Sequence, residues 1–374
     1  MIRVRIIRKN LLQCYYFSLN KYIRLVLNFI FDQNKTYDYK LLMAPVNNIL
    51  IRLPNWLGDM VMATSFVKAV KDHYPEAEID LIAKQGLESL LDYFPIHHKR
   101  FVFSKSEFEG LKGARAFGKR IRKEKKYDLF FCLPDSLSAA TMGAAINAKK
   151  SIGFRKNVRF LLLTNIYKKQ KNLHRVAEYI DLLSQFLKQK IDIPPVVLQA
   201  GRKEISDALV ININSEASSR RLPKEKAISI INAIRNNIDN RIILVGSPSE
   251  SSYVNDVFDL LDNKKNIINL AGQTSLPELV QLFASCRAVL STDSGPAHLS
   301  NALGKKTLVL FGAGNENNTA PFNKEFCKVI RLGKLACEPC VNNICELYSI
   351  PECLLQLDEN LIVENLKKFY TNEF

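Results

Sequence analysis

The chain has 374 residues, of which 47% are hydrophobic and 24% charged, with eight cysteines and a formal net charge of +16. This composition excludes a disordered chain and a small disulfide-stapled scaffold, and the length favours two domains. The excess of positive charge predicts an anionic partner: a nucleic acid, an anionic membrane surface or a phosphorylated substrate. The sequence has no run of about 18 uncharged apolar residues, so we expect no transmembrane helix.

Residues 1–44 form a basic leader with eight Lys or Arg and two Asp. Its apolar stretch LLQCYYFSLNKYIRLVLNFIF is interrupted by Lys21 and Arg24 and lacks an A-x-A cleavage site, which argues against a secretory signal. Two interpretations stay open. The segment is an amphipathic helix lying in a membrane interface, or it is a poorly ordered leader with Met43 as an alternative start.

Strands and helices are expected to alternate from residue 48 onward. The expected strands are 48–53, 79–83, 101–103, 128–133 and 151–154, and the expected helices are 59–74, 86–93, 108–126, 136–147 and 173–189. The helix at 59–74 has apolar residues at i, i+4 spacing, which predicts one buried face. The segment 191–206 contains a Pro pair and few periodic apolar positions, so it predicts a linker.

The alternation resumes after the linker. Strands are expected at 208–214, 241–246, 266–272, 287–292 and 306–312, and helices at 223–238, 250–261, 276–285, 295–303 and 358–370. This pattern predicts an α/β chain with two doubly wound domains, residues 45–190 and 207–374. Ligands of such sheets bind at the carboxyl ends of the strands, so the residues at these ends are the candidates for a site.

Asp59 is the only acid in the stretch NILIRLPNWLGDMVMATSF, where the first strand turns into a helix. A carboxylate in the first helical turn is stabilised by the helix dipole, so capping explains Asp59 without a ligand. The alternative is a general base, which requires the carboxylate to reach a substrate hydroxyl. On the residue pattern alone capping is favoured, and the alternative stays open.

The stretch TDSGPAHLSNALG follows the strand near 287–291 and is the strongest candidate for an anion site. Asp293 or Ser294 can cap the helix, Gly295 permits close approach of a ligand, and His298 lies in the first turn. The free N–H groups of a helix start suit a phosphate. The alternative is a well-capped helix with a solvated histidine.

Two other strand ends carry charged candidates. Arg220 and Arg221 precede a Pro-initiated helix, where a cation could balance a diphosphate; otherwise they form a solvated surface pair. Glu250 is the fourth residue of a capping box that begins at Ser247, which accounts for it without a ligand. The functional alternative for Glu250 is a contact with a ribose hydroxyl.

Four cysteines cluster near the C-terminal end with the spacing C-x2-C-x4-C-x7-C. They are Cys337, Cys340, Cys345 and Cys353. Four thiolates could close a structural zinc site. The irregular spacing equally suits reduced, partly buried thiols.

Taken together, these strand ends resemble the family 9 glycosyltransferases, the lipopolysaccharide heptosyltransferases, over residues 48–370. The resemblance is carried, in this order, by ILIRLPNWLGDMVMATSFVKAVKDHYPEAEIDLIA, by LPDSLSAATMGAAINAKKSIGFRKNVRFLLLTN followed by HRVAEYIDLL, and by STDSGPAHLSNALGKKTLVLFG. The second of these looks most like the branch that adds the second heptose, and the CEPC…C…C pattern also recurs in this family.

The resemblance implies a GT-B fold and an inverting transfer of heptose from ADP-heptose to an inner-core sugar of lipopolysaccharide. No cofactor is required, with Mg²⁺ and a structural zinc as options. By position, Asp59 is the general base. The implied donor-site residues are Ser215, Arg220, Glu250, Asp293, Ser294, Gly295 and His298, and the implied acceptor-site residues are Asp135, Ser136, Arg155 and Arg159.

The chain departs from the family pattern at three places. Arg220, Arg221, Leu222 and Pro223 stand where the family commonly has a lysine and then a Trp-Pro pair. FGAGNENN replaces a loop that usually resembles F-G-P-T-D-P, and Ser294 replaces a threonine. The resemblance therefore implies the family more firmly than the exact sugar.

The expected setting is a monomer at the cytoplasmic face of the inner membrane, in contact with its anionic surface. Three other functions stay open: a family 9 transferase with another nucleotide sugar or with a protein or capsule acceptor, a nucleic-acid-binding protein, and an inactive scaffold. The sequence contains no recognised DNA- or RNA-binding module, and the charge is spread over the leader and several helices.

Overall fold

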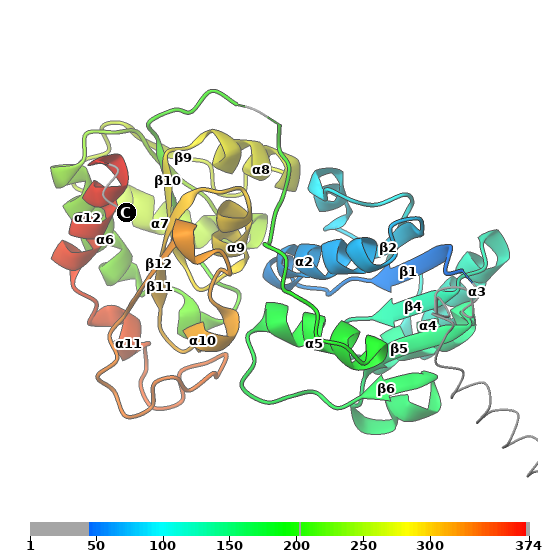
Figure 1. Ribbon diagram of the computed structural model, residues 1–374. Helices are drawn as coiled ribbons and strands as arrows, with labels where there is room; N and C mark the ends of the chain where they lie inside the picture. The colour runs from blue at the N-terminus through cyan, green and yellow to red at the C-terminus, as the bar shows by residue number, and fades with distance from the viewer. Residues whose placement is uncertain (1–44, 202, 372–374) are drawn as a thin grey trace, which may run out of the picture. The chain divides into compact units, whose positions relative to one another are not determined.

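The computed structural model describes residues 45–201 and 203–371 (Figure 1). The leader at 1–44 lies outside the described residues, so its interpretation stays a prediction. The described residues from Val46 onward form one compact unit. Within the described ranges, every helix is too short or too polar to cross a bilayer.

The first sheet has six parallel strands in the order β3-β2-β1-β4-β5-β6. The strands are β1 (Asn48–Arg52), β2 (Glu78–Lys84), β3 (Arg100–Phe103), β4 (Leu129–Cys132), β5 (Lys150–Phe154) and β6 (Asn165–Tyr167). The helices are α2 (Leu57–His73), α3 (Gly110–Glu124), α4 (Leu137–Ile146) and α5 (Arg175–Leu187), with 3₁₀ turns η2 (Glu88–Tyr93) and η3 (Asn157–Leu161). Ile49, Leu50 and Ile51 on the central β1 are fully buried because helices cover both faces of a parallel sheet.

The second sheet is also parallel and six-stranded, in the order β12-β11-β10-β7-β8-β9. The strands are β7 (Leu209–Asn212), β8 (Ile242–Leu244), β9 (Ile267–Asn269), β10 (Ala288–Thr292), β11 (Lys306–Phe311) and β12 (Cys327–Arg331). The helices are α6 (Lys224–Asn237), α7 (Ser251–Asp259), α8 (Leu276–Ser285), α9 (Gly295–Ala302), α10 (Glu316–Thr319), α11 (Glu352–Leu355) and α12 (Glu359–Thr371), and the 3₁₀ turns are η4 (Ser218–Arg220), η5 (Pro248–Glu250) and η6 (Lys324–Phe326).

The predicted alternation of strands and helices is confirmed in both sheets, as is the doubly wound α/β class. Four elements were not predicted, namely β6, β12, α10 and α11, because they are short or lie at a sheet edge with mixed exposure. The predicted helix at 86–93 is a 3₁₀ turn. Residues 191–201 carry no helix or strand, but Val196 and Leu198 are buried in the core, and the domain boundaries stay a prediction.

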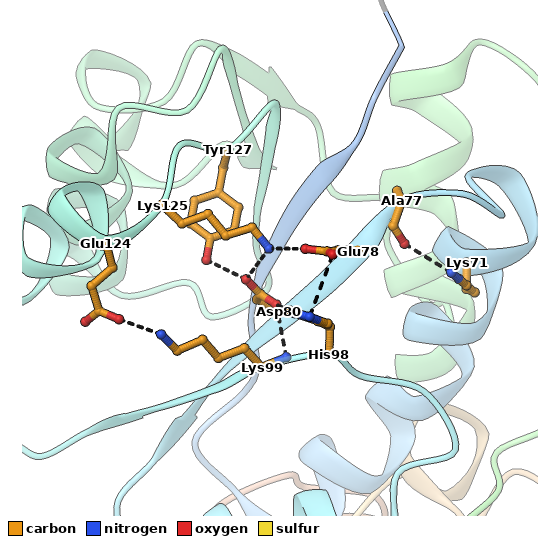
Figure 2. Close-up of polar contacts among 9 residues, drawn as sticks. All are labelled: Lys71, Ala77, Glu78, Asp80, His98, Lys99, Glu124, Lys125 and Tyr127. Carbon is orange, nitrogen blue, oxygen red and sulfur yellow. Dashed lines mark hydrogen bonds and ion pairs between the residues drawn. The ribbon is translucent and has the colours of Figure 1, made fainter.

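A buried carboxylate lies near the amino end of β2 (Figure 2). Asp80 Oδ2 accepts hydrogen bonds from the Tyr127 hydroxyl at 2.7 Å and from Lys125 Nζ at 2.9 Å. Its Oδ1 accepts from the backbone N–H of Lys99 at 3.0 Å and lies 3.1 Å from His98 Nδ1. Burial and the bond to Asp80 raise the pKa of Tyr127. Both carboxylate oxygens therefore have partners. The network is suited to hold β2 to the segments that precede β3 and β4, rather than to bind a ligand.

Candidate active site

Asp59 lies in the first turn of α2, directly beyond the carboxyl end of β1. Arg52, buried at the end of β1, shapes the intervening loop: its Nη2 donates to Asn55 Oδ1 at 2.6 Å and its Nη1 to the Ile82 carbonyl at 3.2 Å. Trp56 is the N-cap residue of α2, and its side chain makes no capping bond. The carboxylate of Asp59 pairs instead with Arg175, whose Nε lies 3.4 Å from Oδ1.

Burial raises the pKa of Asp59, and the cation of Arg175 opposes this effect most strongly. Glu178 adds to the rise, whereas Lys169 and Arg220 lower the pKa. The side chain stays 25% exposed, so the carboxylate is desolvated yet reachable. A carboxylate with raised proton affinity is suited to take a proton from a hydroxyl.

A chain of ion pairs connects Asp59 with Asp135 at the end of β4. Arg175 Nη1 donates to Glu178 Oε1 at 2.6 Å, and Lys169 Nζ lies 2.8 Å from the same oxygen. Lys169 Nζ also donates to Asp135 Oδ2 at 3.0 Å. The sequence analysis missed Arg175, Glu178 and Lys169. Arg175 is the first residue of α5, where a cation is disfavoured by the positive end of the helix dipole. This unfavourable position is the feature of the sequence that indicates an acidic partner for Arg175.

The four acceptor-site candidates differ in how they are placed. Ser136 is the N-cap of α4 and accepts from the backbone N–H of Ala139 at 3.2 Å. Arg159 is buried, with Nη1 3.3 Å from Asp135 Oδ1 and Nη2 3.2 Å from Cys132 Sγ. Arg155 is exposed. Arg159 and Asp135 thus already hold each other, and Arg155 presents its charge to solvent.

Asp293 follows the carboxyl end of β10 and is only 3% exposed. Its Oδ2 lies 3.5 Å from Arg220 Nη1, which is long for a hydrogen bond, and this oxygen has no closer donor within the described part of the chain. Burial raises the pKa of Asp293 to about 6, opposed chiefly by Arg220. A Cβ on Gly314 would come within 2.0 Å of Oδ2, so a side chain at this position would displace the Asp293 carboxylate.

The start of α9 is not capped by a side chain. Ser294 is the N-cap residue, but its Oγ faces inward, accepting from Asn212 Nδ2 at 2.9 Å and lying 3.2 Å from the Thr292 carbonyl. His298 is buried, which lowers its pKa to about 3 and keeps the ring neutral. The alternative of a well-capped helix with a solvated histidine is therefore wrong. Uncapped N–H groups leave the helix start available to an anion.

The starts of α2 and α9 pack against each other. A Cβ on Gly58 would lie 2.6 Å from His298 Cδ2, and a Cβ on Gly295 would lie 2.9 Å from Leu57 Cβ. Both positions need glycine because a side chain would push the helices apart. The turn that carries Asp59 is thereby adjacent to the anion-site candidate.

Arg220 and Arg221 are not a solvated surface pair. Arg220 is one-third exposed and pairs with Asp293, whereas Arg221 Nη2 donates to the Ser215 carbonyl at 3.0 Å and its guanidinium lies over the Tyr253 ring. The buried Ser215 is thus held by Arg221 through its backbone.

Glu250 forms the predicted capping box. Its Oε2 accepts from the Ser247 backbone N–H at 2.9 Å and from the Ser247 hydroxyl at 2.7 Å. The box occupies one carboxylate oxygen and leaves the other for a ligand.

The four clustered cysteines are free thiols. Cys353 is buried, and the others are partly exposed. Burial raises the pKa of Cys353 to about 11, which opposes thiolate formation. Across residues 45–201 and 203–371, no three His, Cys, Asp or Glu side chains are placed to hold a metal ion.

Two parallel Rossmann-like sheets, with candidate residues beyond the carboxyl ends of β1 and β10, define a GT-B fold. The structure of Escherichia coli ADP-heptose lps heptosyltransferase II superposes with a TM-score of 0.73 at 24% identity, covering 87% of this chain and 99% of that chain. The model of glycosyltransferase family 9 (heptosyltransferase) matches residues 114–350.

Two relatives extend the match. The lipooligosaccharide heptosyltransferase 2 of Campylobacter jejuni is 26% identical over 339 residues, covering 86% of this chain and 99% of that protein. The lipooligosaccharide heptosyltransferase 2 of Haemophilus ducreyi is 30% identical over 315 residues, covering 76% of this chain and 88% of that protein. The chain belongs to glycosyltransferase family 9 and is a transferase.

Proposed function

We propose that the chain transfers heptose from ADP-heptose to an inner-core sugar of lipopolysaccharide, with inversion at the anomeric carbon. The observation that carries the proposal is the adjacency of two parts: a desolvated, partly exposed carboxylate on α2 and an uncapped helix start with a nearby arginine on α9 and η4. The names of the relatives supply the heptose and the lipopolysaccharide acceptor.

Asp59 acts as the general base. The acceptor hydroxyl gives its proton to the Asp59 carboxylate as its oxygen attacks the anomeric carbon from the face opposite to the leaving ADP. Arg175 keeps Asp59 ionised before the reaction and is held in place by Glu178. Single displacement with one base yields the inverted anomer.

Arg220 and the start of α9 receive the charge of the departing diphosphate. The guanidinium is one-third exposed and held near Asp293, and the first N–H groups of α9 lack a side-chain cap. Preorganised donors aimed at developing negative charge lower the barrier. His298, neutral at physiological pH, adds no charge and backs the turn that carries Gly58. Every step uses side chains or backbone N–H groups of this chain, and the proposal assigns no cofactor.

The proposal also includes the residues that contact the donor and the acceptor, the oligomeric state and the location of the protein. Glu250 contacts the ribose with the oxygen that the capping box leaves, and Ser215 and Gly295 line the donor. Asp135, Ser136, Arg155 and Arg159 serve the acceptor side. The protein works as a monomer at the cytoplasmic face of the inner membrane.

The test is a transfer assay with ADP-heptose and purified lipopolysaccharide that ends at the first heptose. We expect release of ADP together with a product whose new linkage has the anomeric configuration opposite to that of the donor, read by NMR. Turnover of a UDP-sugar but not of ADP-heptose would contradict the donor assignment, and a retained configuration would contradict the single displacement.

A further inference from the structure

A turn next to the edge strand of the first sheet displays three large apolar side chains. Val158, Phe160 and Leu161 in η3 are 51%, 46% and 73% exposed. Single exposed apolar residues are ordinary on a protein surface, but three within four consecutive residues form a contiguous patch. Arg155 and Lys156, both exposed, directly precede the turn.

Buried side chains on the inner side of η3 fix the orientation of this turn. Arg159, in the same turn, points inward with 1% exposure and pairs with Asp135 and Cys132. Leu163, just after the turn, is buried and lies against Gly143 and Gly153. Because these side chains occupy the space beneath, the three apolar ones cannot turn inward without expelling a buried arginine.

Positive charge borders the patch on a second side. The backbone N–H of Arg155 bonds to the Tyr167 carbonyl at 2.8 Å, which brings the end of β6 and the following exposed Lys168 beside it. The neighbouring acid, Asp135, is paired with Arg159 and Lys169, and its Oδ2 also lies 3.9 Å from Nζ of Lys156, whose side chain stays 55% exposed. Apolar side chains with a basic border match the acyl boundary and the anionic headgroups of a lipid bilayer.

We propose that η3, with Arg155, Lys156 and Lys168, is the docking site of the protein on an anionic lipid bilayer. Val158, Phe160 and Leu161 enter the acyl boundary, and the three cations contact lipid phosphates. The inference deepens the proposed function, and rests on it for the membrane setting of the acceptor. It assigns docking to the folded unit, independently of the leader at 1–44.

The docking turn is connected to the candidate base. Arg159 binds Asp135, and from there the ion pairs through Lys169, Glu178 and Arg175 end at Asp59. Docking through η3 would therefore hold the site at a fixed height above a lipid-anchored acceptor.

The test uses the full chain with Trp56→Phe, which removes its single tryptophan. On this background, Phe160→Trp is the probe and Leu347→Trp, at a site that is 69% exposed, is the matched control. Both are mixed with phosphatidylglycerol vesicles whose acyl chains are brominated, and with neutral phosphatidylcholine vesicles of the same kind. We expect the bromines to quench the Phe160→Trp probe on the anionic vesicles only, and to leave the Leu347→Trp control unquenched.

A second experiment changes the patch itself. Replacement of Val158, Phe160 and Leu161 by Ser should weaken binding to anionic vesicles about tenfold or more, because apolar burial is lost. The matched control replaces Leu260, Ile344 and Leu347, which are 59%, 68% and 69% exposed, by Ser and should bind as the wild type does.

Two results would overturn the docking proposal. They are a protein that sediments with the vesicles but leaves the Phe160→Trp probe unquenched, which would assign binding to another segment, and a protein that does not sediment at all. Calorimetric binding of ADP to the two Ser-substituted variants, which keep Trp56, should match the wild type, so failure of docking is separable from failure of the donor site.

Discussion

Two regions of the molecule bury carboxylates in opposite ways. Asp80, near the amino end of β2, has a partner for each oxygen: a tyrosine, a lysine, a backbone N–H and a histidine. Asp293, at the carboxyl end of β10, has an oxygen whose closest cation is 3.5 Å away, and burial raises its pKa to about 6. A buried acid with full hydrogen bonding stabilises a fold, whereas one left short of partners marks a site.

The position in the sheet separates the two regions as well. Asp80 lies within β2, and its partners come from the segments that directly precede β3 and β4 of the same sheet (Figure 2). Asp59 and Asp293 follow strands of two different sheets, and the starts of α2 and α9, where these two residues lie, pack against each other. In parallel sheets the helix starts and their dipoles gather at the carboxyl ends of strands, so charges placed there can act on a ligand.

The largest effect is expected at Asp59. Asp59→Asn keeps the size and removes the base, so turnover should fall by roughly two to four orders of magnitude. Donor affinity should stay within a few-fold, measured by calorimetry beside the rate. Turnover comparable to the wild type would contradict the base assignment.

The converse is expected at Asp80. Asp80→Ala leaves Lys125 and Tyr127 without their acceptor, so the free energy of unfolding should fall by about 3 kcal/mol. The rate per folded molecule, measured at low temperature, should be unchanged. A variant of normal stability with lost turnover would place Asp80 among the functional acids. It would contradict the proposed difference between Asp80 and the two site residues, Asp59 and Asp293.

Glu250 can be separated from its capping role because the chain has a second capping box, Ser275 with Glu278. Glu250→Ala and Glu278→Ala should lower the Tm by similar small amounts. Only Glu250→Ala should weaken ADP binding, about tenfold, because it alone removes a charged hydrogen bond to the ribose. Equal ADP affinity in the two variants would leave capping as the full explanation of Glu250.

The smallest effect concerns the pH dependence of Asp293. Its pKa is raised from 3.8 to about 6, so the folded protein holds this proton more tightly than the unfolded chain does. The resulting stabilisation is complete below about pH 4 and is lost as the pH rises through about 6. Asp293→Asn lacks this dependence. Its stability relative to the wild type should therefore increase by about 1 kcal/mol between pH 5 and 7.5, measured by urea unfolding. A stability difference between the two proteins that does not change with pH would contradict the raised pKa of the buried Asp293 carboxylate.

The fold was largely predictable from the sequence because strands buried on both faces give apolar runs and amphipathic helices give a regular period. The edge strands β6 and β12 were not predicted because their short, half-exposed sequences resemble those of loops. The Ser247 capping box was also predictable, since its hydrogen bonds are local and depend on two residues of fixed spacing.

The candidate site was predictable residue by residue but not as an assembly. Local patterns indicated Asp59, Arg220 and Asp293, yet their pattern alone favoured capping and solvated charges. The partners that change the interpretation, Arg175 and Glu178, lie over 100 residues from Asp59 in sequence and reach it only through tertiary packing. Burial, which sets the pKa of Asp59 and Asp293, is likewise a property of the folded chain.

The most direct test of the donor site is calorimetric titration of the purified full chain with ADP, UDP, GDP and ADP-heptose. We expect binding of the two adenine compounds only, and its loss in the Arg220→Ala and Asp293→Asn variants. Binding of UDP or GDP in their place, or no nucleotide binding by a folded sample, would contradict the proposed heptose transfer.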